Sequence, residues 1–145
     1  MKKIQTIFTV FILVFAVQIS IFGQGKFDKW PEIKAYHTVM SATFHPSETG
    51  DLEPIKKRSG ELAEKSDALA KAKIPAEFDK KDIVEAVKKL NADSKSLDKL
   101  VKAKAKDEEI KTALVALHNT FHTIVEKCQP DDHHGHDHSG HDHKH

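Results

Sequence analysis

Apolar residues recur three and four positions apart over four stretches of the chain, and no stretch alternates apolar and polar residues as a strand does. The first stretch begins at Trp30-Pro31, since proline is well tolerated in the first turn of a helix. It is predicted to end at Pro46, where "PSETGD" is a turn sequence. The residues expected on its inward face are Ile33, His37, Met40 and Phe44.

Three further helices follow with the same periodicity. The second is predicted to begin near Asp51 as N-cap, the third at Asp79 as N-cap, and the fourth at Asp107. Their expected core positions are Ile55, Leu62 and Leu69, then Ile83, Val87, Leu90, Leu97 and Val101, then Ile110, Leu114, Leu117, Phe121, Ile124 and Cys128. Four amphipathic helices with short connections predict an all-α, up-down-up-down antiparallel four-helix bundle.

The N-terminal segment has the layout of a secretory signal peptide. A short basic start is followed by an apolar stretch and a small residue, so residues 1–23 are predicted to be removed, with the cut before Gln24 or one residue later. The apolar stretch is only just long enough to cross a bilayer, which takes about 20 residues, so an uncleaved anchor is the alternative. Cleavage predicts a periplasmic or secreted protein, with residues 24–129 as the bundle and no membrane association afterwards.

Charge and composition narrow the classes of partner. A formal net charge of +1 indicates neither nucleic acid nor an anionic membrane surface. The sequence contains no Gly-rich phosphate loop, no catalytic triad and no pair of inward carboxylates, so we do not expect an enzyme. The single cysteine, Cys128, leaves three options: a buried thiol, a metal ligand, or a disulfide to a second copy in a homodimer.

Histidines on two helices predict a metal site inside the bundle. His118 and His122 are four residues apart and therefore share one face of the last helix. Because the first and last helices of such a bundle are antiparallel neighbours, counting about 1.5 Å per residue from their ends brings His37 level with that pair, and Met40 close to the same level. Three imidazoles and a thioether at one height can bind a transition metal. A purely structural cluster is the alternative, and His45 is a secondary candidate ligand.

Residues 130–145 form a tail that contains seven of the eleven histidines. Its histidines alternate with aspartate and glycine and it has no apolar residue to bury, so we expect it to be disordered without a ligand and to bind metal. The predicted tail ligands are His133, His134, His136, His138, His141, His143 and His145. Imidazoles suit zinc, nickel or oxidised copper, and Met40 would add a preference for reduced copper.

The methionine on the first helix and the histidine in "HNTFH" on the last give the bundle a resemblance to the periplasmic four-helix-bundle cytochromes, both the soluble b-type family and cytochrome c-prime. The resemblance covers about residues 30–128 and implies a haem held by Met40 and His122. The chain lacks the C-x-x-C-H of covalent haem attachment, and His37 and His118 crowd the place of a porphyrin. We therefore expect a haem-free, metal-binding relative of this cytochrome-like family.

Together these features predict an exported protein that buffers, sequesters or carries copper or zinc. The interior site would hold the ion, and the tail would capture ions and raise their local concentration nearby. A b-type haem electron carrier is the first alternative. A structural or partner-binding bundle without a metal is the second.

Overall fold

The computed structural model describes residues 27–129, so the predicted signal peptide (1–23) and histidine tail (130–145) lie outside the described residues. In chain order the elements are α2 (Pro31–Glu48), α3 (Glu53–Lys71), the short 3-10 helix η1 (Ala76–Phe78), α4 (Lys81–Lys102) and α5 (Asp107–Lys127). The described range contains no strand. None of its helices is both long enough and apolar enough to cross a bilayer.

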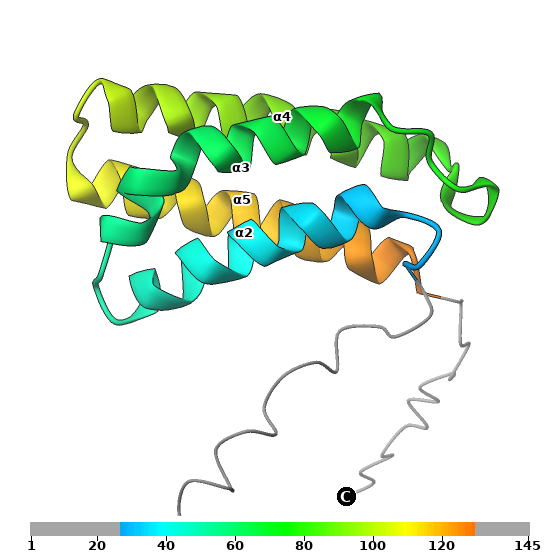
Figure 1. Ribbon diagram of the computed structural model, residues 1–145, viewed down its shortest axis with the longest axis horizontal. Helices are drawn as coiled ribbons and strands as arrows, with labels where there is room; N and C mark the ends of the chain where they lie inside the picture. Colours follow the sequence, from blue (N-terminus) through cyan, green and yellow to red (C-terminus); the bar gives the residue numbers. More distant parts are fainter. Residues whose placement is uncertain (1–26, 130–145) are drawn as a thin grey trace, which may run out of the picture.

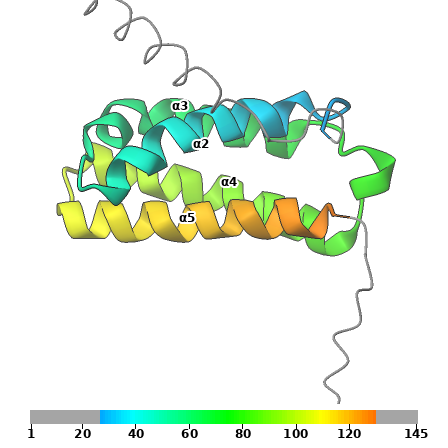
Figure 2. The same cartoon turned by 90° about the horizontal axis from the view of Figure 1, so that it is seen from below.

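The four long helices run antiparallel to their neighbours in sequence, as Figure 1 shows. Each packs against the next, and α5 returns to lie beside α2, which closes the ring. In Figure 2, α2 and α3 form one layer and α4 and α5 the other. The predicted all-α up-down-up-down bundle is confirmed. Of the four neighbouring pairs, α2 and α5 touch each other least.

Two predicted helix ends differ from the structure. α2 continues through Pro46 to Glu48, because a proline in the last turn removes only one backbone hydrogen bond. The carbonyl of Pro46 then accepts from the N–H of Asp51 at 3.0 Å, which closes the turn. Asp79 does not cap α4. It ends η1, where its N–H donates to the carbonyl of Ala76, and the residue before α4 is Lys80, which makes no side-chain cap.

The other predicted starts agree with the structure to within two residues. Pro31 lies in the first turn of α2, and α5 begins at Asp107. Asp51 lies two residues before α3, and its Oδ1 accepts a hydrogen bond from the N–H of Glu53 at 3.0 Å. That bond satisfies one of the amide groups that a helix leaves unpaired at its N-terminus.

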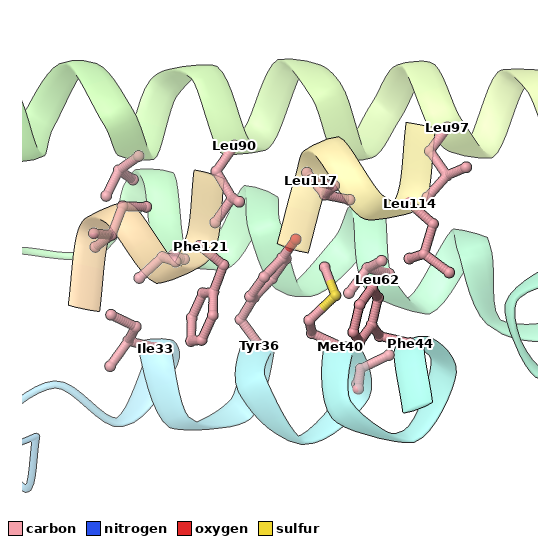
Figure 3. Packing of buried hydrophobic residues seen from close by; sticks show 14 of the residues in the cluster. Ile33, Tyr36, Met40, Phe44, Leu62, Leu90, Leu97, Leu114, Leu117 and Phe121 are labelled. Atoms are coloured by element: carbon pink, nitrogen blue, oxygen red, sulfur yellow. The ribbon is translucent and has the colours of Figure 1, made fainter. Parts of the chain in front are cut away.

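The core is a continuous apolar cluster contributed by all four long helices (Figure 3). On α2 its inward side chains are Ile33, Tyr36, Met40 and Phe44, so Tyr36 occupies the place that the sequence assigned to His37. Both choices fit a spacing of three and four residues. Tyr36 is buried, and its hydroxyl is satisfied by Ser94 Oγ on α4, 3.2 Å away. The burial raises the pKa of Tyr36.

Candidate metal centre

The four histidines of the described range lie along the line where α2 meets α5, which we call the α2–α5 seam. His37 and His118 are half-buried, whereas His45 and His122 are exposed. All four are thus at the edge of the core, and the site predicted for the bundle interior has its imidazoles near the surface.

The Nε2 atoms of His118 and His122 lie 3.1 Å apart. A neutral imidazole has one donor and one acceptor nitrogen, so one ring donates its Nε2–H to the other. Two nitrogens that both bind the same ion at 2.0–2.1 Å lie about 2.8 to 3.4 Å apart, for N–metal–N angles between those of a square and a tetrahedral site. The rings are therefore already at the separation of two metal ligands. To bind an ion, the donating ring would have to move its proton to Nδ1, and both rings would have to turn until their Nε2 lone pairs point at the ion instead of at each other.

Two phenylalanine rings support the imidazoles. The ring of His118 lies on the ring of Phe44, with centroids 3.6 Å apart and planes 4° from parallel. The ring of His37 is stacked on that of Phe121 at 5.4 Å. Phe44 and Phe121 are both buried, so they are fixed by the core. These contacts restrict the rotamers of the half-buried histidines before any ligand arrives.

The electrostatics of the seam favour neutral imidazoles. Burial lowers the pKa of His37, and the neighbouring His122 and His45 lower it further. Burial also lowers the pKa of His118, again with help from His122 and His45, while Glu48 acts in the opposite direction. A metal ion competes with protons for these nitrogens. A lowered pKa therefore keeps the nitrogens unprotonated, and able to bind a metal ion, down to a lower pH.

His45 has a carboxylate partner on the same helix. Its Nδ1 lies 2.9 Å from Oε2 of Glu48. An ionised carboxylate can only accept, so Nδ1 carries the proton and the lone pair of a neutral ring is on Nε2. Metal-binding histidines commonly have this arrangement, with one nitrogen held by a carboxylate and the other on the ion.

Met40 is separated from the surface histidines. Its side chain has no exposed surface and points into the core between Tyr36 and Phe44 (Figure 3). His122, by contrast, is exposed. Within residues 27–129, no three His, Cys, Asp or Glu side chains converge closely enough to hold an ion. The structure thus brings together His118 and His122 on α5, with His37 and His45 on the facing helix α2, but does not gather the predicted ligands at one point.

A haem held by Met40 and His122 does not fit this packing. The side chains of Phe44, Leu117 and Phe121 are buried around Met40 and fill the region that a porphyrin would need. Cys128 follows α5 and is also buried in the core. The prediction that Cys128 completes the core is confirmed.

No family model matches the chain, and no curated protein or solved structure is significantly similar to it. The sequence reasoning overlooked Glu48 and the supporting role of Phe44. Glu48 could have been found, because a carboxylate three residues after His45 lies on the same helix face. The stacking of Phe44 on His118 depends on how two helices meet, and no local pattern in the sequence encodes it.

Proposed function

We propose that this protein is an exported transition-metal-binding protein that buffers, sequesters or carries copper or zinc. The observation that supports this best is the 3.1 Å approach of the Nε2 atoms of His118 and His122. Export to the periplasm or outside the cell is part of the proposal and rests on the signal-peptide layout of residues 1–23.

An exchangeable ion suits this site better than a permanent one. Structural zinc sites are closed by four protein ligands, whereas the pair on α5 leaves positions open. Two neutral nitrogens favour zinc, oxidised copper or nickel. The burial of Met40 removes the reason to prefer reduced copper. In this proposal the seven tail histidines capture ions and supply them to the pair at high local concentration.

Titration of Zn²⁺ and Cu²⁺ tests the proposal. The starting protein is the exported chain in which all seven tail histidines are replaced by glutamine, so that only the bundle is measured. We expect His118→Gln with His122→Gln to weaken binding at least tenfold. Asn119→Ala with Thr123→Ala is the matched control, since these two side chains are exposed on the same helix with the same spacing. Equal affinities for the two double variants would refute the bundle site.

Purified protein also distinguishes the alternative functions. A Soret band would identify a b-type haem carrier. Colourless protein in which elemental analysis finds zinc or copper supports the proposal. A metal-free structural or partner-binding bundle predicts that neither chelators nor metals change the melting temperature. An ion that binds only the folded chain raises that temperature by mass action.

A further inference from the structure

Two imidazoles leave an ion short of ligands. Protein zinc sites use three or four side chains, and the pair of His118 and His122 provides two. Among residues 27–129, a third ligand requires a side chain near the pair that can turn toward it. The nearby nitrogen and sulfur donors are His37, His45 and Met40.

His45 meets the requirements best. Its ring and that of His118 both contact the ring of Phe44, at 5.9 Å and 3.6 Å between centroids. The side chain of His45 is 64% exposed and that of Glu48 is 56% exposed. Both can therefore change rotamer without opening the core. The hydrogen bond from Nδ1 to Glu48 leaves Nε2 of a neutral ring as the atom that can bind an ion.

The other two donors are held elsewhere. The ring of His37 is half-buried and stacked on Phe121, so turning it toward an ion would break that contact. Met40 is completely buried and cannot reach the surface without unpacking α2 from the core. Either side chain would have to give up more packing than His45 to become a ligand.

We propose that His45, oriented by Glu48, is the third ligand of a divalent ion bound at His118 and His122, and that the ion thereby bridges α2 and α5. This inference rests on the proposed function. The bound ion is a divalent cation such as Zn²⁺. Its fourth coordination position is left for water or for an incoming ligand such as an imidazole. Binding requires the His45 side chain to swing toward the pair, with Glu48 keeping the proton on Nδ1.

The bridge would have a structural consequence. α2 and α5 touch each other least among the neighbouring helices, and the ion would join them through His45 on one side and the pair on the other. Because the three ligands come from two helices and are brought together only in the folded chain, Zn²⁺ should raise the melting temperature, and the rise should shrink when His45 is lost. Loss of a carboxylate that orients a ligand typically costs 10- to 100-fold in metal affinity.

The experiment uses the full exported chain with the seven tail histidines replaced by glutamine and measures Zn²⁺ affinity by competition with a chromogenic chelator. His45→Gln and Glu48→Gln are compared with His37→Gln, the control at the other end of the seam. We expect the first two to weaken binding at least tenfold and the control to change it less than twofold. In ¹⁵N spectra, Zn²⁺ should shift Nε2 of His45, and Glu48→Gln should reduce the share of the His45 ring that carries its proton on Nδ1.

Three results overturn the inference in distinguishable ways. If His45→Gln binds Zn²⁺ as well as the parent while the His118→Gln/His122→Gln variant does not, the third ligand is wrong but the proposed function stands. The same holds if His37→Gln is the variant that weakens binding. If the double variant binds normally, the proposed function and this inference fail together.

Discussion

The imidazole of His118 lies flat on the phenyl ring of Phe44, 3.6 Å away between centroids. Phe44 belongs to α2 and His118 to α5, the two neighbouring helices that touch each other least. One contact therefore both joins these helices and fixes the orientation of a candidate ligand. A core residue is thereby coupled to a site on the surface.

Phe44→Leu should weaken Zn²⁺ binding several-fold, because leucine fills much of the volume but offers no flat face to hold the imidazole. The lost ring contact should also reduce the free energy of unfolding by about 1 kcal/mol beyond the change in buried area. Phe78→Leu is the control, since Phe78 is similarly buried but packs against Phe27 and Trp30. Chelator competition and urea unfolding measure the two effects. Equal affinities for both variants would show that the stacking does not orient the ligand.

Met40→Leu should leave Zn²⁺ affinity unchanged, because the thioether is buried in the core and is not a ligand. Leucine has nearly the same volume, so the loss in stability should stay below about 1.5 kcal/mol. Metal titration and thermal unfolding of the same preparation check both statements. A tenfold loss of affinity would place the sulfur on the ion and restore the interior site.

Ser94→Ala should destabilise the bundle more than Tyr36→Phe does. Ser94 Oγ donates to the carbonyl of Leu90 at 2.8 Å, so the tyrosine hydroxyl is the donor in the 3.2 Å contact between them. Removing the serine leaves a buried hydroxyl without that acceptor, at about 1–3 kcal/mol, whereas removing the tyrosine hydroxyl leaves the serine bonded and costs about 1 kcal/mol. Urea unfolding of both single variants and the double variant measures this. Equal single-variant losses would mean that the tyrosine does not depend on Ser94.

Asp98 should make stability fall in acid. Burial raises its pKa, but the ion pair with Lys102 and the hydrogen bond from Ser59 outweigh this, so the pKa is lowered overall. A lowered pKa in the folded state means that the contribution is complete above the unfolded value of about 3.9, and that it is lost as the pH falls below that value and through the lower pKa of the folded state.

Urea unfolding between pH 7 and pH 2 checks this prediction. Asp98→Asn should lose less stability over that range than the parent, while Glu85→Gln, an exposed carboxylate on the same helix, should follow the parent. Parallel curves for Asp98→Asn and the parent would contradict the assignment.

The sequence by itself determined the four helices and the pairing of His118 with His122. Both depend on spacing within one segment, since apolar residues three and four apart mark a helix face and residues four apart are neighbours on it. Proline in the first turn and acidic residues at the start of α5 also act locally, which is why those boundaries agree with the structure.

Only the tertiary structure decided which residues of α2 face the core. His37 and Tyr36 fit the same periodicity, and a small rotation of the helix exchanges their places. That rotation is set by the packing of α2 against α3 and α5 and by the hydrogen bond from Tyr36 to Ser94 on α4. The spacing already placed Met40 and Phe44 on the inward face, but only the packing of α2 on α5 brings the ring of Phe44 against His118. These contacts join residues that are far apart in the sequence. They are determined by how the helices pack against one another, so the sequence of a single helix does not reveal them.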